Sequence, residues 1–250
     1  MGISAFYESY QSRNRLDPDQ VVATIEQLSR RIKERFPEAE LIHACDELLR
    51  LSREAKTRAT WIDRPIVVLR LAVAIAIALI AFGLISALSQ LSPSVRPLDV
   101  VLFVSVLEAS INNVLLLAAA IYFLVTIETR IKRKRSLVAI HDLRSLAHII
   151  DMHQLTKDPD RLLSTREDTK SSPATGMTLY QMSRYLDYCG EMLSLIGKIA
   201  AIYGFHWNDA VALQSIANVE QLTTDLSQKI FQKVMILHDY IDVPSGSRPT

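Results

Sequence analysis

Four polar residues that share one helical sector lie within a mostly apolar stretch of the chain, namely Ser105, Glu108, Asn112 and Asn113. On a helix that turns 100° per residue, these side chains fall within a sector of roughly 140°. An ionisable side chain inside a membrane is costly unless it faces other helices or water. Symmetry-related copies of Glu108 and Asn112 would line an axial pathway that attracts cations. We therefore treat the four residues as candidate pore-lining positions.

The same helical sector becomes apolar further along the chain, where it contains Leu116, Ala119 and Phe123. A narrow apolar ring of this kind can gate a pathway by excluding water. Leu116 and Phe123 are thus candidate constriction residues.

Two other interpretations of the polar sector stay open. The two asparagines and a protonated Glu108 would also hold helices together through interhelical hydrogen bonds. Alternatively, residues 100–127 span about 42 Å as a helix, against a hydrocarbon core of about 30 Å, which would place Glu108 in the outer interface. Pore lining, helix contact and interfacial position each predict a different response to mutation.

Histidines are the other candidates for chemistry, because His141, His148 and His153 lie within thirteen residues that also contain two aspartates. His141 and His148 share a helix face but lie about 10 Å apart along its axis. Metal ligands converge at about 2.1 Å, so these histidines would need ligands from other elements. The simpler interpretation is hydrogen bonding to the neighbouring aspartates, and we expect neither a metal nor another cofactor. No HExxH or nucleophile motif is present, so we expect no enzymatic activity.

The polar sector and the candidate constriction residues belong to the second of two apolar runs, at about 66–88 and 100–127. Each exceeds the roughly 20 apolar residues that a membrane-spanning helix needs. Arg70, the one charge in the first run, lies near its start and can extend toward the headgroups. The sequence therefore predicts an integral membrane protein with a two-helix transmembrane hairpin at 65–127.

The distribution of basic residues predicts the orientation of this hairpin. Five lysines and arginines lie within 50–64 and five within 130–135, whereas Arg96 is the one basic residue of the connector 89–99. Because basic residues are retained on the cytoplasmic side, we expect both termini in the cytoplasm and a multi-pass protein of the cell membrane.

The second basic cluster is also expected to contact anionic lipid. Its members are Arg130, Lys132, Arg133, Lys134 and Arg135. No aromatic stacking motif is interleaved with these charges, so we expect no nucleic-acid partner.

The rest of the chain shows helical periodicity without any strand pattern, which predicts an all-α fold. Its N- and C-terminal segments are expected to form a cytoplasmic helical bundle. The first helix should begin at Asp17-Pro18 and end near Phe36, and Pro37 should begin a second one. The predicted segments are N-terminal helices in 1–64, a basic juxtamembrane stalk helix in 128–155, a linker in 156–177, a helical hairpin in 178–242 and a disordered tail in 243–250.

A regular 3-4 spacing of apolar residues marks the first helix of the C-terminal hairpin and predicts a coiled-coil or bundle seam. The seam residues are Leu179, Met182, Leu186, Cys189, Leu193 and Ile196. We expect Gly204 to Trp207 to break this helix and a closing helix to run from Asn208 to about Asp242. The narrow seam predicts a partner helix, from this chain or from a second copy.

These features lead to two functional hypotheses. The first is a homo-oligomeric two-span protein that forms a channel for ions or small solutes, with the bundle as its gating and assembly module. The alternative is a non-conducting scaffold or sensor, anchored in the membrane, that recruits a cytosolic protein partner through the C-terminal hairpin.

Overall fold

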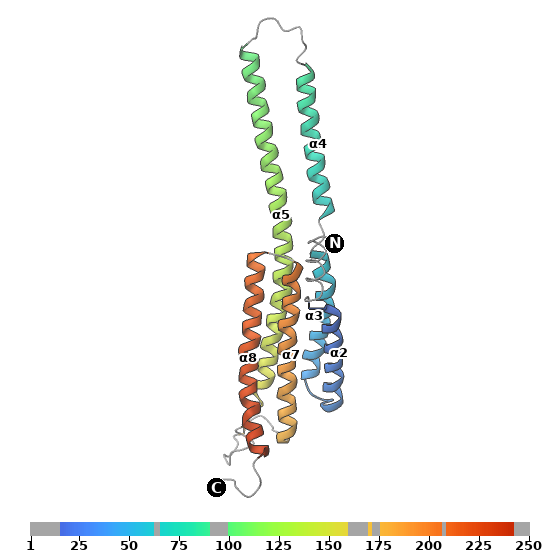
Figure 1. Ribbon diagram of the computed structural model, residues 1–250, viewed down its shortest axis with the longest axis vertical. Helices are drawn as coiled ribbons and strands as arrows, with labels where there is room; N and C mark the ends of the chain where they lie inside the picture. Colours follow the sequence, from blue (N-terminus) through green and yellow to red (C-terminus); the bar gives the residue numbers. More distant parts are fainter. Residues whose placement is uncertain are drawn as a thin grey trace, which may run out of the picture. The chain divides into compact units, whose positions relative to one another are not determined.

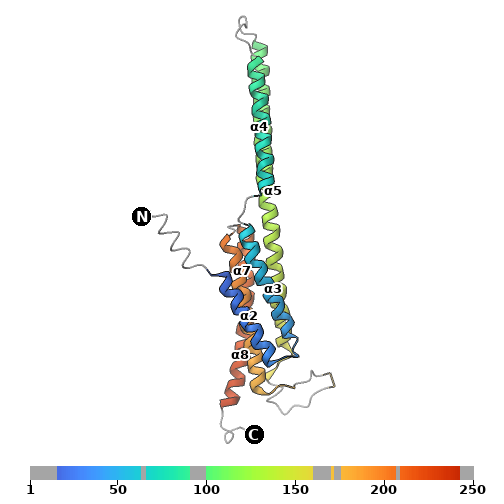
Figure 2. The ribbon, with the colours of Figure 1, turned by 90° about the vertical axis from the view of Figure 1, so that its right-hand side faces the viewer.

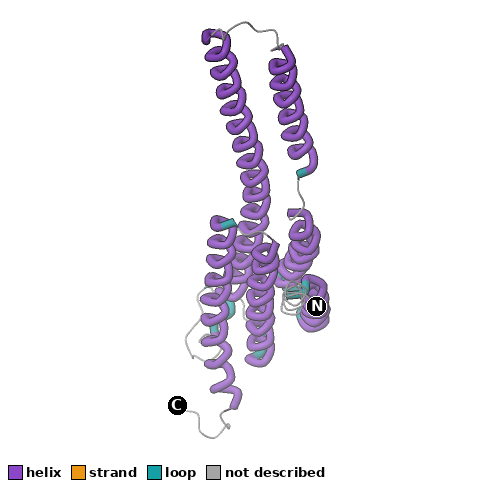
Figure 3. The backbone as a smooth tube through the Cα atoms, turned by 45° about the horizontal axis from the view of Figure 1, so that its top comes forward, coloured by secondary structure: helices purple, strands orange, loops and turns teal. Residues whose placement is uncertain are grey.

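The computed structural model describes residues 16–62, 66–90, 100–159, 170–171, 176–206 and 209–242. In this part of the chain every regular element is a helix, which confirms the predicted all-α class (Figures 1 and 3). The helices are α2 (Pro18–Arg35), α3 (Leu41–Ile62), α4 (Val67–Gln90), α5 (Val100–Leu155), α7 (Leu179–His206) and α8 (Ala210–Asp242). The predicted connector turn at 92–97, most of the predicted linker and the predicted C-terminal tail lie outside the described residues.

The chain divides into two compact units. The first, called here the bundle unit, combines Met1–Asp63 with Arg135–Thr250. The second, the two-helix unit, comprises Arg64–Lys134. Helix α5 contributes residues to both units, and each unit is described by itself below.

Helix α2 begins as the sequence predicts. Asp17 is its N-cap and accepts a 2.9 Å hydrogen bond from the Asp19 backbone N–H, while Pro18 occupies the first helical position. Asp and Pro suit these two places because the first N–H groups of a helix lack partners within it. The helix ends where the Phe36 N–H donates to the Ile32 carbonyl at 2.8 Å.

Helix α3 begins at Leu41, later than the predicted restart at Pro37. The intervening residues form a turn, in which the Ala39 N–H donates to the Phe36 carbonyl at 3.1 Å. Leu41, Cys45 and Leu48 form an apolar stripe along α3, and none of them has exposed surface.

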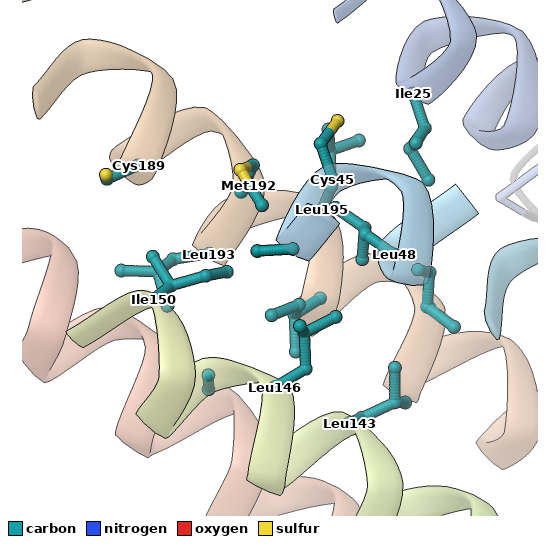
Figure 4. Packing of buried hydrophobic residues seen from close by; sticks show 14 of the residues in the cluster. Ile25, Cys45, Leu48, Leu143, Leu146, Ile150, Cys189, Met192, Leu193 and Leu195 are labelled. Atoms are coloured by element: carbon teal, nitrogen blue, oxygen red, sulfur yellow. The ribbon is translucent and has the colours of Figure 1, made fainter. Parts of the chain in front are cut away.

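Helix α5 continues without a break from the apolar run into the stalk and ends at Leu155, as predicted. Its last turns contribute buried residues to the core of the bundle unit. Figure 4 shows Leu146 and Ile150 of α5 pointing toward Met192 and Leu193 of α7.

Helices α7 and α8 form an antiparallel hairpin. A Cβ on Gly197 would lie 3.3 Å from Thr223 Oγ1, and one on Gly204 would lie 3.4 Å from Ile216 Cδ1. Helix α7 ends at His206, within the break predicted at Gly204 to Trp207, and Gly204 itself is still helical. A single glycine costs only about 1 kcal/mol within a helix, and here it allows close approach of α8.

Side-chain caps begin both helices of this hairpin. Thr178 and Gln181 form a reciprocal capping box, in which each backbone N–H donates to the other side chain, at 2.9 and 3.2 Å. Asp209 accepts from the N–H groups of Val211 and Ala212, both at 3.1 Å. These partners satisfy backbone donors that a helix start otherwise leaves unpaired.

The seam of α7 is covered by helices of the same chain. Met182, Leu186, Cys189, Leu193 and Ile196 are fully buried, and Leu179 is partly buried. Helices α2, α3 and α8 contact α7, and residues of α5 belong to the same core. Burial of these seam residues therefore requires no second copy.

In the two-helix unit, α4 and the first part of α5 lie side by side (Figures 1 and 2). Glu128 of α5 interacts with the Ile66 backbone and with Arg70, both at the beginning of α4. The beginning of α4 thus meets α5 well past the start of α5, as in an antiparallel helix pair.

Candidate functional site

The polar sector of α5 is exposed in the single chain. Glu108, Asn112 and Asn113 all lie on the surface of the two-helix unit, although α4 runs beside α5. The backbone of Ser105 is helical, but its side chain lies outside the described residues. Helix α4 therefore leaves these polar groups uncovered.

Large apolar side chains surround this polar sector and are exposed as well. Leu107, Ile111 and Val114 each expose about half of their surface, and the candidate constriction residues Leu116 and Phe123 expose 60% and 64%. A water-soluble monomer rarely presents such a continuous apolar surface. An exposed apolar surface of this kind is typical of helices that contact lipid or other helices.

The described residues contain one helix that is long and apolar enough to cross a membrane, at Ser110–Leu155. None of its most apolar window is buried inside the molecule, whereas a core helix of a water-soluble protein would be mostly covered. In α4, the segment Arg70–Gly83 meets the apolar criterion over a shorter length. By length and composition, one helix of the described residues could thus cross a membrane.

Polar groups beyond the apolar part of α5 find partners on the helix itself. The hydroxyls of Thr126 and Thr129 donate to the backbone carbonyls of Tyr122 and Val125, at 2.8 and 3.1 Å. Hydroxyls bonded in this way carry no unsatisfied donor into an apolar environment.

The basic cluster, residues 130–135, comes directly after Thr129 in the sequence. Lys132 forms a 3.0 Å ion pair with Glu128, while Arg130, Lys134 and Arg135 are exposed and Arg133 is partly exposed. The exposed members could reach anionic headgroups without breaking that ion pair.

The three candidate histidines do not converge. His141 and His148 are exposed, and Nδ1 of His153 lies 3.8 Å from a carboxylate oxygen of Glu40, an ion pair only when the imidazole is protonated. Among the described residues, no group of three or more His, Cys, Asp or Glu side chains is placed to hold a metal ion.

Both cysteines are free and buried. Burial raises the pKa of Cys45 and of Cys189 to about 12. Each therefore stays a neutral thiol at neutral pH, which makes it a poor nucleophile and a poor metal ligand.

One contact that sequence reasoning missed joins α2 to α7. The Arg31 guanidinium binds both carboxylate oxygens of Glu191, at 2.8 and 3.0 Å. It also lies 5.1 Å from the ring centre of Tyr188, and Arg184 lies 5.3 Å from the same ring. No local pattern in the sequence indicates a pair that is 160 residues apart.

Comparisons of this chain with protein-family models, with curated proteins and with solved structures give no match. By its described residues this is an all-α protein with a helical bundle unit and a long apolar helix that could cross a membrane.

Proposed function

We propose that this chain is a two-span membrane protein whose copies assemble through α5, so that Glu108, Asn112 and Asn113 face other helices or water. The observation that carries the proposal is the exposure of these three side chains on an otherwise apolar helix surface. Lipid contact would cost a few kcal/mol or more for the ionisable group alone.

The second span of this proposal is α4. Its 24 residues extend about 36 Å at 1.5 Å per residue, which exceeds a hydrocarbon core of about 30 Å. Val68, Leu79 and Phe82 each expose more than 60% of their surface, so their own unit leaves them uncovered. Arg70, the one charge between Ile66 and Leu88, is exposed close to the beginning of the helix, where it can reach the headgroups.

Assembly around an axis would turn the polar sector into a pathway. Carboxylates of Glu108 would attract cations, and the amides of Asn112 and Asn113 would replace part of an ion's hydration shell. Leu116 and Phe123 would then form the apolar constriction one to four turns further along α5. The bundle unit would stay cytoplasmic, as the basic residues on both flanks favour.

The test is a pair of substitutions in liposome flux assays on the purified full-length chain. Glu108→Gln keeps the shape and hydrogen-bonding ability of the side chain but removes its charge, so cation flux should fall while insertion and assembly persist. Asp142→Asn is the control, because it removes a carboxylate from the part of the same helix that belongs to the bundle unit, outside the polar sector.

Glu108→Leu separates pore lining from helix contact. If Glu108 only holds helices together, Gln should be tolerated fully, whereas Leu should weaken the assembly. Failure of the unmodified protein to pass ions at any voltage, pH or divalent-cation concentration would overturn the channel proposal.

A non-conducting membrane-anchored scaffold is the second candidate, favoured by one specific observation. The core of the bundle unit is formed by helices of a single chain, and all seam residues of α7 except Leu179 are fully buried. Because the bundle unit needs no second copy to form its core, its outer surface can bind a cytosolic partner. Absence of ion flux together with a monomeric mass would favour this function.

A further inference from the structure

A groove of about 870 Å³ runs between α7 and α8. Its α7 side presents small residues one turn or two turns apart, namely Gly190, Ser194, Gly197 and Ala201. On the α8 side the side chain of Phe231 lines the groove with 63% of its surface exposed. Small residues beside an exposed aromatic ring form a surface that suits the apolar face of another helix.

Leu16, where the described part of the chain begins, lines this groove and packs against the core. Helix α2 runs antiparallel to α7, because Arg31 meets Glu191 while Arg35, one turn later, meets Tyr180. Leu16 precedes Arg31 by about four helical turns, so it lies toward the Ala201 end of the groove. The fifteen residues before Leu16 therefore start at one end of this surface.

The sequence of those fifteen residues matches the groove in pattern and length. Ile3, Phe6, Tyr7 and Tyr10 follow the i, i+3, i+4, i+7 spacing and would lie within a sector of roughly 100° on a helix. From Ile3 to Tyr10 a helix spans about 10 Å, and from Gly190 to Ala201 the groove spans about 16 Å. The remaining residues 11–15 are polar and long enough to reverse the chain direction at Leu16.

Charges at the Leu16 end are complementary. Arg13 and Arg15 directly precede Leu16, and Glu220 lines the groove one turn from Thr223, on the side toward Gly204. Lys198 also lines this end, but its ammonium is engaged with Ser194, whose hydroxyl lies 2.7 Å away.

We propose that residues 3–10 bind in the α7–α8 groove of their own chain as an amphipathic helix, with Phe6 and Tyr7 against the small residues of α7. The C-terminal tail fits the groove less well, since residues 243–250 contain two prolines and no apolar 3-4 spacing. Occupation by residues 3–10 makes this face of the bundle unit part of its core.

Disulfide trapping in the full-length, detergent-solubilised chain tests the proposal. Tyr7→Cys combined with Ser227→Cys, which lies midway along the α8 side, should form an intramolecular disulfide on mild oxidation. Ala5→Cys with the same Ser227→Cys is the matched control, because residue 5 would lie on the opposite face of the segment. We expect at least a fivefold faster intramolecular cross-link for the first pair, whereas equal rates would overturn the proposal. A predominantly intermolecular cross-link would also overturn it, by assigning the groove to a second copy.

A second measurement leaves the groove unmodified, so that it does not depend on a groove variant folding. Trypsin should cleave after Arg13 and Arg15 several-fold faster in the Phe6→Asp variant than in the unmodified chain, whereas Glu8→Gln should leave the rate unchanged. Equal rates for Phe6→Asp and the unmodified chain in detergent would contradict groove binding. Protection that arises only in vesicles containing anionic lipid would assign residues 3–10 to the membrane surface instead.

Discussion

The Lys233 ammonium of α8 donates to the backbone carbonyl of Gln154, near the end of α5, at 3.0 Å. It also reaches Oε1 of Gln154 at 2.7 Å and the Lys157 carbonyl at 3.3 Å. The last carbonyls of a helix lack partners within it, and a cation there also complements the helix dipole. Burial lowers the pKa of Lys233, while Asp158 and Asp151 act in the opposite direction. Lys233 of α8 thus supplies hydrogen-bond donors to the end of α5.

Replacement of Lys233 by Ala should destabilise the bundle unit by about 1 to 3 kcal/mol, because the carbonyl acceptors at the end of α5 lose their partner. Thermal unfolding followed by circular dichroism measures the effect. Lys229→Ala, one turn earlier and exposed, is the control and should leave the melting temperature nearly unchanged. Equal effects of the two substitutions would show that Lys233 contributes no more than a surface lysine.

Introduction of a charge into the seam should unfold the bundle unit. Leu193 is fully buried, so Leu193→Asp places a carboxylate without a counter-charge in the core, at a cost of about 3 to 5 kcal/mol. Met235→Asp is the control, since Met235 exposes 44% of its surface on α8. We expect loss of helical circular dichroism for the first variant only. Unchanged helicity of Leu193→Asp would mean that the seam is not a packing surface.

Much of the fold was predictable because local sequence patterns determine where its helices begin and which of their side chains are buried. The Asp17-Pro18 start of α2, the continuation of α5 into the stalk and the apolar stripe of α3 follow from capping and 3.6-residue spacing. The caps at Thr178 and Asp209 were also readable, since Thr-x-x-Gln and Asp before a helical run are known start signals.

Pairing between helices was not predictable, because it depends on contacts across long sequence separations. The pair of Arg31 and Glu191 gives no local signal. Lys233 does give one, since it lies beside the buried residues Ile230 and Leu237 of α8, where an isolated charge indicates a buried partner. The seam of α7 was readable as a packing surface, but its spacing alone could not say which helices cover it.

Alkaline pH should destabilise the bundle unit through its buried thiols. Burial raises the pKa of Cys189 from 9.0 to about 12, so above pH 9 the unfolded chain releases a proton that the folded chain retains. The contribution is fully present below about pH 9 and is lost as the pH rises toward 12. Urea unfolding of the unmodified chain and of Cys189→Ala, at pH 8 and at pH 10.5, isolates this effect. The unmodified chain should lose more stability between the two pH values, and equal losses would contradict a raised pKa.

The proposed topology predicts different accessibility for two serines. A cysteine at Ser94, in the connector, should react with an impermeant thiol reagent added to intact cells. A cysteine at Ser245 should react only after permeabilisation. The two native cysteines are buried, so we expect them to contribute little to the labelling. The reverse pattern would invert the assigned sidedness, and labelling of both sites in intact cells would indicate that α5 does not cross the membrane.

The number of subunits tests the central proposal most directly, because Glu108 can face a shared axis only if enough copies of α5 surround it. Light scattering with refractive-index and absorbance detection gives the protein mass in a detergent micelle. We expect an assembly of four or more copies of the 28.1 kDa chain, which Glu108→Gln preserves. A monomer or dimer over the whole accessible concentration range would contradict it, since four membrane helices or fewer leave no room for a pathway lined by α5.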